Sequence, residues 1–387
     1  MATLLFYITF LLLYNGVITI DVMRYASVQY SILYSEFIDS QGQFYPYYGH
    51  PLEEDWTSTT AVTGWTSGFF PGVFWNIVQY NATREALNRA LSVTMPTAAF
   101  ANSTSPYNAG FIIMSGFGTA YRLLKLKEYL DIVITGAHSL ATQYSPTVRC
   151  LRSVDSREGY LVYIDNMMNL ELLFEASNQT KDQSLYNLAW QHANRTMYEQ
   201  FRDDNSTYHV VEYNETDGSV IRKYTVQGYA DWSTWSRGQS WAIHGYTIAY
   251  RYTKYQPFLD RAIGATNYVL LRLPNDSIPY WDYDAPYNST YQPRDTSAAA
   301  IFASALVELS EYMSDPSLKD RYLSVAKSIV DQLSSPNYMI YGDKDYKLSA
   351  LLANGTIGPY PKNPYDVALS FGDYYLTQTI IRLMKHQ

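Results

Sequence analysis

Two kinds of segment alternate along this chain of 387 residues, and the alternation restricts the possible folds more than any other feature. The first kind is rich in small and aromatic residues and nearly free of Lys and Glu. It covers residues 66–78, 110–123, 165–174, 238–250, 296–309 and 366–381. The second kind has apolar residues at helical spacing and a charged face. It covers residues 27–39, 83–100, 127–143, 181–201, 258–271 and 318–333.

The alternation predicts an all-α barrel. A helix that is apolar on every side is buried, whereas a helix with a charged stripe faces solvent. Alternating pairs of this kind therefore predict an inner ring of helices inside an outer ring, which is an (α/α)6 barrel. An open helical solenoid is the alternative architecture. No Pro-, Gly- or Ser-rich linker interrupts the chain, so residues 21–387 are expected to form one domain.

One stretch departs from the helical pattern. Residues 208–213 and 219–226 are rich in β-branched and aromatic residues and flank a loop that contains Gly218. This pattern predicts a β-hairpin. Because the hairpin leads directly into the buried segment 238–250, it is expected to lie at the mouth of the barrel.

Charge and cysteine content argue against several classes of function. The net charge is −8 and no cluster of Lys and Arg stands out, which argues against nucleic-acid binding. The single cysteine, Cys150, rules out an internal disulfide. No His and Cys residues have the spacing of a metal site, and neither a phosphate-binding loop nor a nucleophile elbow is present. The sequence carries no signal of an oligomeric state.

The N-terminal residues and the glycosylation acceptors point outside the cell. Residues 3–20 form an apolar run, so residues 1–20 are predicted to be a secretory signal. A membrane anchor is the alternative, because the run approaches spanning length. Asn-x-Ser/Thr acceptors imply surface loops of a secreted glycoprotein. They occur at Asn81, Asn102, Asn178, Asn194, Asn205, Asn214, Asn275, Asn288 and Asn354. We expect a secreted protein with no stable membrane association after signal removal.

Polar or aromatic residues stand where the predicted inner helices begin. The positions are Trp65, Asn108, Asp165, Arg237, Asp295 and Asp366. Inner helices of such a barrel run parallel, so their starts converge at one end, where helix N-termini favour an anionic ligand. The alternative for each aspartate is a helix cap. Asp165 follows an apolar run, and a carboxyl group in such surroundings has a raised pKa and can serve as a general acid.

Residues 227–253 run from a polar loop into a helix that carries Arg237 and Trp241. A cation in the first helical turn costs stability unless an anion faces it. Trp241 follows one turn later on the same side. Because a guanidinium binds carboxylate in a fork and an aromatic face packs on a sugar ring, the pair suits a sugar that carries a carboxylate. The alternative is that Trp241 belongs to the core and Arg237 is a structural ion-pair partner.

Several stretches together carry a family resemblance. They are residues 65–75 (WTSGFFPGVFW), 164–170 (IDNMMNL), 209–211 (HVV), 225–241 (with SRGQSW), 279–282 (PYWD), 295–301 (DTSAAAI) and 365–375 (YDVALSFGDYY). In this order, across residues 50–385, they resemble the unsaturated glucuronyl hydrolases, glycoside hydrolase family 88. The resemblance implies an (α/α)6 barrel. It also implies an acidic oligosaccharide substrate with a 4,5-unsaturated uronic acid at its non-reducing end, and no metal or organic cofactor.

The resemblance also implies residue roles. Asp165 is the acid/base: it protonates one carbon of the double bond while water adds to the other, next to the ring oxygen. The hemiketal then opens and expels the aglycone. The implied substrate contacts are Trp65 (as a stacking wall), His209, Thr225, Gln227, Arg237 and Trp241. On its own pattern, His209 is a residue of a half-apolar strand, for which simple packing is the alternative.

One position departs from the family pattern. The family carries a His-Asp-x-Gly-Phe motif, whereas residues 107–111 here read Tyr-Asn-Ala-Gly-Phe, so Asn108 replaces a second catalytic-site aspartate. An amide donates hydrogen bonds but cannot take a proton. Without that negative charge, Asp165 is expected to ionise more readily and to work best at low pH. Two hypotheses follow: a hydrolase that runs on Asp165, and a sugar-binding protein on the same barrel that has lost turnover.

Overall fold

The inner helices are the six apolar segments. The computed structural model describes residues 11–14, 17–20, 22–154, 159–286, 292–341 and 345–386. The inner elements, whose side chains are mostly buried, are α3 (Phe69–Tyr80), the π-helix η2 (Gly110–Gly118) with α5 (Thr119–Leu124), the 3-10 turn η3 (Ile164–Asn169) with α7 (Leu170–Thr180), α9 (Ser236–Thr253), α11 (Thr296–Ser310) and α13 (Ser370–Met384).

The outer helices are the six amphipathic segments, and each buries one face. They are α2 (Val22–Asp39), α4 (Arg84–Thr94) with the 3-10 helix η1 (Met95–Asn102), α6 (Lys127–Ala141), α8 (Gln183–Glu199), α10 (Gln256–Leu270) and α12 (Pro316–Leu333). In α12, for example, Tyr322, Ala326, Ile329 and Leu333 are buried at three- and four-residue steps.

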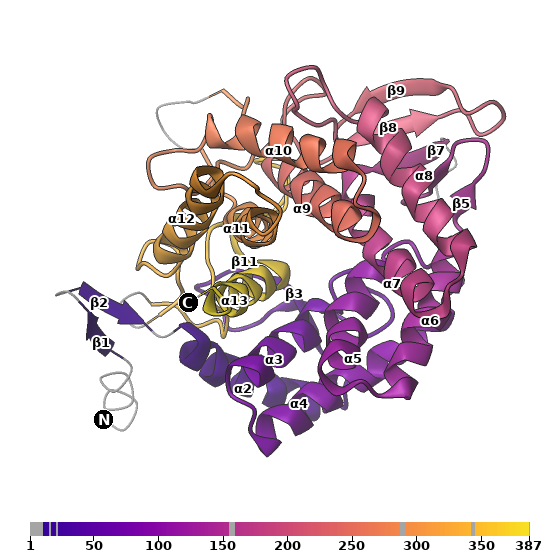
Figure 1. Cartoon of the computed structure of the whole chain (residues 1–387). Helices are drawn as coiled ribbons and strands as arrows, with labels where there is room; N and C mark the ends of the chain where they lie inside the picture. Colours follow the sequence, from indigo (N-terminus) through magenta and orange to yellow (C-terminus); the bar gives the residue numbers. More distant parts are fainter. Residues whose placement is uncertain are drawn as a thin grey trace.

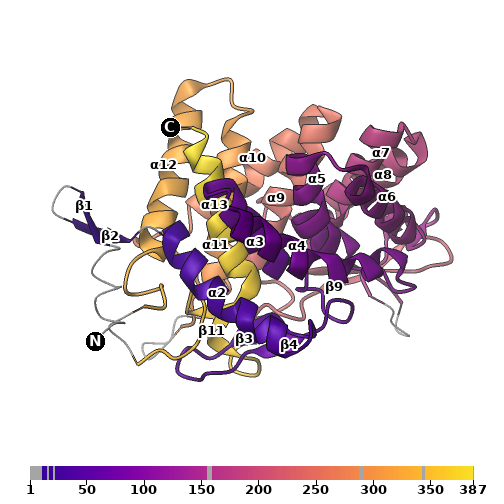
Figure 2. The same ribbon diagram turned by 90° about the horizontal axis from the view of Figure 1, so that it is seen from below.

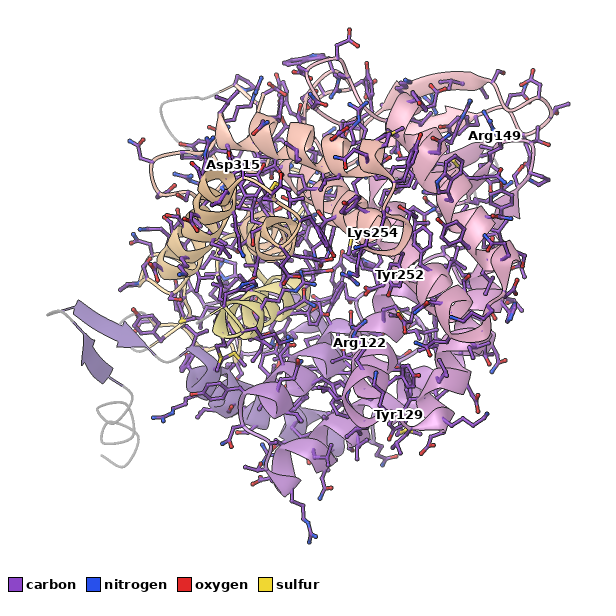
Figure 3. The ribbon with its side chains drawn as sticks, in the orientation of Figure 1. Arg122, Tyr129, Arg149, Tyr252, Lys254 and Asp315 are labelled. Atoms are coloured by element: carbon purple, nitrogen blue, oxygen red, sulfur yellow. The ribbon has the colours of Figure 1, made fainter. Side chains whose placement is uncertain are left out.

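The inner elements form a closed ring. Each packs against the next along the chain, and α13 returns to pack against α3 (Figure 1). Closure confirms the predicted (α/α)6 barrel and excludes the open solenoid. Seen along the ring axis, Arg122 and Tyr252 lie beside the central opening and Arg149 and Asp315 lie toward the outside (Figure 3).

Short sheets gather at the end of the ring where the inner helices begin (Figure 2). One sheet has the order β10-β11-β3-β4, from β10 (Gly355–Thr356), β11 (Tyr365–Leu369), β3 (Tyr45–Gly49) and β4 (Thr57–Thr59). A second has the order β7-β8-β9, from β7 (Tyr160–Tyr163), β8 (Val210–Tyr213) and β9 (Val220–Tyr224). Two further pairs are β5 (Tyr144–Ser145) with β6 (Cys150–Leu151), and β1 (Leu11–Tyr14) with β2 (Val17–Ile20). The β1–β2 pair lies to the side of the ring (Figures 1 and 2).

The opposite end of the ring collects positive charge. The inner helices α5, α7 and α9 are each followed by a lysine in the left-handed conformation, namely Lys125, Lys181 and Lys254. Their last turns include Arg122 and Arg251. Cations at this end offset the negative pole of the parallel helix dipoles.

Three sequence predictions need correction or extension. Asp366 does not open the sixth inner helix: it lies in β11, which pairs with β3, and α13 begins only at Ser370. The predicted helix 83–100 is α-helical only to Thr94, and η1 then starts with Pro96 in its first turn. The predicted hairpin 208–226 exists as β8 and β9, but β7 joins it as a third strand.

The predicted signal at residues 1–20 stays a prediction, because residues 1–10, 15 and 16 lie outside the described part of the chain. Among the helices that the structure describes, none combines the length and the apolar character that crossing a bilayer requires.

Candidate active site

The β7–β8 pairing brings Asp165 and His209 together. Tyr163 pairs with Val210 across the two antiparallel strands, and the Ile164 N–H donates to the His209 carbonyl at 2.9 Å. Asp165 follows directly in η3, and His209 directly precedes β8. The sheet therefore fixes two residues that stand 44 positions apart in the sequence at one edge of the barrel.

Asp165 has the properties of a general acid. Its Oδ1 is sealed from solvent and has no hydrogen-bond partner in the described part of the chain. Burial raises the pKa of Asp165 to about 7, while the positive charge of Arg237 opposes the rise. The sequence prediction that Asn108, standing in place of a second carboxylate, makes Asp165 easier to ionise stays a prediction. Burial alone keeps this carboxyl protonated in much of the population near neutral pH.

His209 is a neutral hydrogen-bond donor. Its side chain is 3% exposed, and burial together with Arg237 lowers the pKa of His209 to about 3. The Val226 N–H donates to Nδ1 at 3.3 Å, which assigns the ring proton to Nε2. Nε2 is buried and unpartnered among the described residues. The Trp235 ring lies 4.4 Å from the imidazole and holds its plane. This Nε2–H is thus free to donate to a ligand.

Arg237 is bonded by the protein itself. Nη1 donates to Asp295 Oδ2 at 2.5 Å and to the Thr356 carbonyl at 2.7 Å. Nη2 donates to Gln227 Oε1 at 2.8 Å and to the Ile357 carbonyl at 2.9 Å. The anion that compensates a cation in the first turn of α9 is therefore Asp295, and both terminal nitrogens are occupied. The geometry favours the structural ion-pair alternative, and direct binding of a ligand carboxylate by Arg237 stays a prediction.

Asp295 also fulfils its predicted capping role. Its Oδ1 accepts from the Ser297 N–H at 3.1 Å and from Ala298 N–H at the start of α11, while Oδ2 holds Arg237. One buried carboxylate thus fixes the relative position of α9 and α11. Its second role could not be read from the sequence, because the two residues are 58 positions apart.

Thr225 and Gln227 lie on a loop that the surrounding chain holds firmly. Thr225 Oγ1 accepts from the Gly228 N–H at 2.8 Å and lies 3.4 Å from His209 Nδ1. The Gln227 carbonyl accepts from Trp281 Nε1 at 2.7 Å. Asp282, which the sequence did not single out as a site residue, accepts from the Tyr229 N–H and the Ser233 hydroxyl of the same loop. The loop therefore presents both predicted residues beside His209 and Arg237.

Asn108 is tied to Asp165 through Asn169. Asn108 is half-buried and directly precedes the helical turn that leads into η2. Asn169, in the turn that carries Asp165, accepts from the Gly110 N–H at 2.8 Å and donates to the Tyr107 carbonyl at 2.6 Å. A Cβ at Gly110 would lie 2.4 Å from the Asn169 Cα, so the close approach requires glycine there. The only sequence signal for Asn169 is a polar residue within an apolar segment.

An aromatic layer separates this site from the other end of the barrel. The Trp65 ring, half-buried, lies 5.6 Å from Phe111 and 5.1 Å from Phe371. Trp241 is fully buried, 5.2 Å from Phe111 and 5.3 Å from Tyr375. Trp65 is placed to form a wall of the candidate site. Trp241 lies in the core beneath, so a ligand contact by Trp241 stays a prediction.

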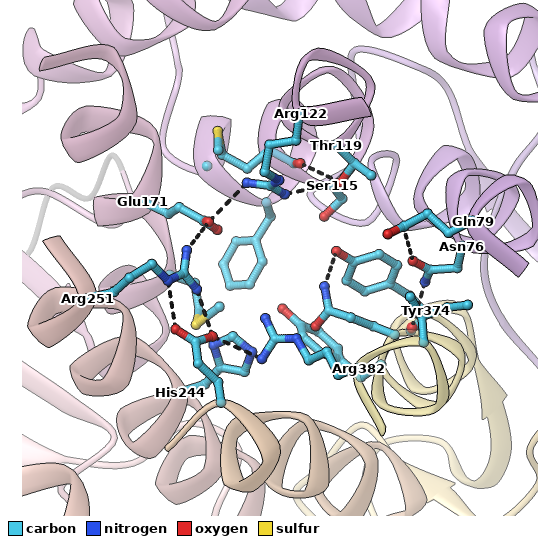
Figure 4. Close-up of a pocket in the computed structure, with 18 of the residues that line it drawn as sticks. Asn76, Gln79, Ser115, Thr119, Arg122, Glu171, His244, Arg251, Tyr374 and Arg382 are labelled. Atoms are coloured by element: carbon cyan, nitrogen blue, oxygen red, sulfur yellow. Dashed lines mark hydrogen bonds and ion pairs between the residues drawn. The ribbon is translucent and has the colours of Figure 1, made fainter. Parts of the chain in front are cut away.

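A well-formed cavity lies elsewhere in the barrel. It has a volume of about 580 Å³ and opens at the end of the barrel where the inner helices finish (Figure 4). Its lining includes none of the eight predicted site residues. Among the described residues, no three His, Cys, Asp or Glu side chains are grouped to hold a metal ion.

Comparisons with known proteins agree with this arrangement. No protein-family model matches the chain. An unsaturated glucuronyl hydrolase of Formosa agariphila is 38% identical over 82% of this chain and 79% of its own length. An unsaturated chondroitin disaccharide hydrolase of Streptococcus agalactiae is 30% identical over 84% of this chain and 82% of its own. The solved structure of an unsaturated glucuronyl hydrolase specific for heparin covers 94% of this chain and 96% of its own, with a TM-score of 0.87 at 29% identity.

The barrel and these relatives lead to one assignment: the chain belongs to the unsaturated glucuronyl hydrolases, a family of glycoside hydrolases.

Proposed function

We propose that this protein removes a 4,5-unsaturated uronic acid from the non-reducing end of acidic oligosaccharides. The observation that carries the proposal is Asp165: a carboxyl whose pKa is raised by burial to about 7, with a buried oxygen that has no partner among the described residues. The relatives' names support an acidic sugar substrate, since they specify glucuronyl groups, chondroitin disaccharides and heparin.

In the proposed reaction, the proton of Asp165 is transferred to C4 of the double bond, and positive charge develops at C5 beside the ring oxygen. Water adds its oxygen to C5 and returns a proton to the Asp165 carboxylate, so the acid is regenerated. The resulting hemiketal opens to a ketone at C5. The hemiacetal left at C1 then expels the aglycone as an alcohol and becomes an aldehyde.

The neighbouring groups are suited to this chemistry. His209 offers a neutral Nε2–H that can bind a ligand oxygen without adding a charge beside the developing cation. Arg237 acts at longer range: its charge limits the rise in the pKa of Asp165, so the carboxylate is not too basic to release its proton. Asn108 can hold a sugar hydroxyl through its amide.

The test is the loss of ultraviolet absorbance of the conjugated C4=C5 bond when unsaturated disaccharides from a polysaccharide lyase are mixed with the protein. We expect turnover by the natural chain and a drop of at least ~10²-fold for Asp165→Asn, the usual contribution of general acid catalysis. Binding of the disaccharide without turnover at any pH would favour the second hypothesis, a sugar-binding protein, for which Asn108 is the motivating observation.

We also propose that the protein acts outside the cell. In support, several glycosylation acceptors are exposed on the described surface, namely Asn81, Asn102, Asn178 and Asn275. Asn205 is different, because its Oδ1 accepts from Arg261 Nη1 at 2.8 Å and its side chain is packed against Gly264. Glycopeptide mapping of the secreted protein should find glycans on the exposed group and none on Asn205. Retention of the protein inside the producing cell would contradict the proposal.

A further inference from the structure

The cavity of about 580 Å³ lies at the end of the barrel opposite Asp165, and it is of the size that ligand cavities usually have. Phe111 and Tyr375, which belong to the aromatic layer under the predicted site, also line this cavity. The cavity is therefore a separate compartment of the barrel with its own lining.

Part of the cavity wall is a chain of side chains with alternating charges. Arg122 Nη1 lies 3.2 Å from Glu171, which in turn lies 2.7 Å from Arg251 Nη1. Arg251 also pairs with both carboxylate oxygens of Glu308 at 2.7 Å, and Glu308 lies 2.9 Å from Arg382 Nη1. Three guanidinium groups thus share two carboxylates, and this charge chain ends in Arg122 on one side and Arg382 on the other.

The two ends of the charge chain face the same open centre (Figure 4). Arg122 and Arg382 both act electrostatically on the Tyr374 hydroxyl, which lies on the neutral side of the cavity. The side chain of Arg122 is 40% exposed, whereas that of Glu308 is only 7% exposed. Arg122 and Arg382, the latter 21% exposed, are therefore both more exposed than the two carboxylates between them, since Glu171 is 14% exposed. Glu311, which also lines the cavity and is 52% exposed, stands outside this charge chain.

The helix dipoles explain why arginines occur at this end of the barrel, but they do not explain why the arginine side chains turn into the cavity. Arg122, Arg251 and Arg382 stand in the last turns of α5, α9 and α13, where a cation is favourable. That effect would be served equally by side chains that extend into solvent. Here the arginines turn inward, bind acidic partners and leave net positive charge at the cavity.

His244 supplies a second, independent indication of a ligand. It lines the cavity and is 3% exposed, yet neither ring nitrogen has a partner among the described residues. Burial lowers the pKa of His244 to about 3, so the ring is neutral, with one N–H donor and one bare acceptor nitrogen. Two hydroxyl groups of one small ligand, one accepting from the N–H and one donating to the bare nitrogen, match that pair of functions.

We propose that this cavity binds a small hydroxylated carboxylate, of the size of one sugar acid. Its carboxylate would lie between Arg122 and Arg382, adding a third anion to the three guanidinium groups. Its hydroxyls would reach His244 and the neutral wall of Ser115 and Tyr374. The site is distinct from the one that contains Asp165, and the proposal does not depend on the reaction proposed above.

The test is calorimetric titration with D-glucuronate, using D-glucose as the uncharged control. We expect glucuronate to bind at least about tenfold more tightly than glucose, because a charge-assisted bond to arginine is lost with the carboxylate. Arg382→Met should weaken glucuronate binding by a similar factor. The same change at Arg89, which pairs with Glu85 on the outer helix α4, should have no effect. Absence of saturable binding to the natural chain would overturn the proposal.

A second measurement covers the case in which Arg382→Met does not fold. The imidazole signals of the natural chain can be followed by NMR during the glucuronate titration, with His244→Gln used to assign the cavity residue. We expect the His244 signals to shift and those of His209, at the other end of the barrel, to stay in place. Shifts confined to His209 would place the sugar acid in the predicted active site and refute the cavity proposal.

Discussion

Replacing Asp165 by asparagine should abolish turnover and stabilise the fold. The folded-state pKa of Asp165, about 7, lies above its usual value of 3.8 because burial disfavours the charged form. The folded state therefore holds this proton more tightly than the unfolded state. The associated stability is fully present below pH ~4 and is lost as the pH rises through about 7. Because asparagine does not titrate, the Asp165→Asn variant should not lose this stability as the pH rises.

The size of the effect follows from the pKa shift. A rise from 3.8 to about 7 corresponds to at most about 4 kcal/mol at pH values above 7. Asp165 as a whole is only half-buried, and solvent screening reduces the figure, so we expect a gain of roughly 2 kcal/mol for Asp165→Asn. The gain should shrink toward zero near pH 4.

Asp373 provides a matched control. Burial raises the pKa of Asp373 to about 7 as well, but its carboxylate accepts from the N–H groups of Leu351 and Leu352, each at 3.0 Å. Asp373→Asn would place an amide against a backbone N–H and should destabilise the fold by ~1–3 kcal/mol. Thermal unfolding between pH 4 and pH 8 measures both variants. If Asp165→Asn shows no stability gain that grows with pH, burial does not keep this carboxyl protonated.

Three further predictions concern the surroundings of Asp165. Asn108→Asp should move the alkaline limb of the pH–rate profile upward by ~1 unit, because a nearby negative charge raises the pKa of Asp165; an unmoved limb would show that the two side chains do not interact. Arg237→Met leaves Asp295 buried and unpaired, so the unfolding free energy measured by denaturant titration should fall by ~3–5 kcal/mol. A loss below ~1 kcal/mol would show that the ion pair does not stabilise the fold. Asn169→Asp keeps the acceptor for Gly110 but loses the bond to Tyr107, so kcat should drop ~10-fold with little change in KM; a change confined to KM would contradict a positioning role.

The barrel could be predicted from the sequence because each of its helices can be recognised from a short stretch of residues. Each inner or outer helix shows its environment in its own composition, and the six pairs then leave few ways to close a ring. The position of Asp165 at the end of an apolar run was readable for the same reason. The short strands around the site were mostly missed. Strand β7 has only four residues, and its pairing with β8 depends on residues some 50 positions away.

The partners of the polar residues could not be read from local pattern. The sequence left two interpretations of Arg237 open, a carboxylate-binding residue and a structural ion-pair partner, because no local pattern shows that its anion comes from the start of α11. The burial that raises the pKa of Asp165 is likewise a property of the assembled barrel. The spacing of the helices along the sequence predicts which residues meet at one end of the barrel. The packing of the folded chain decides which of those residues already have hydrogen-bond or ion-pair partners within the protein.

The long-range bonds of Arg237 have a consequence for synthesis of the protein on the ribosome. Two of its acceptors, the carbonyls of Thr356 and Ile357, are made about 120 residues after Arg237 itself. The last helix, α13, then closes the ring against α3, which is among the first to emerge. A nascent chain that already contains Arg237 therefore lacks two of the acceptors that hold it until almost all of the chain has left the exit tunnel. A chain cut before residue 350 would contain every predicted site residue and still lack the framework that holds Arg237 in place.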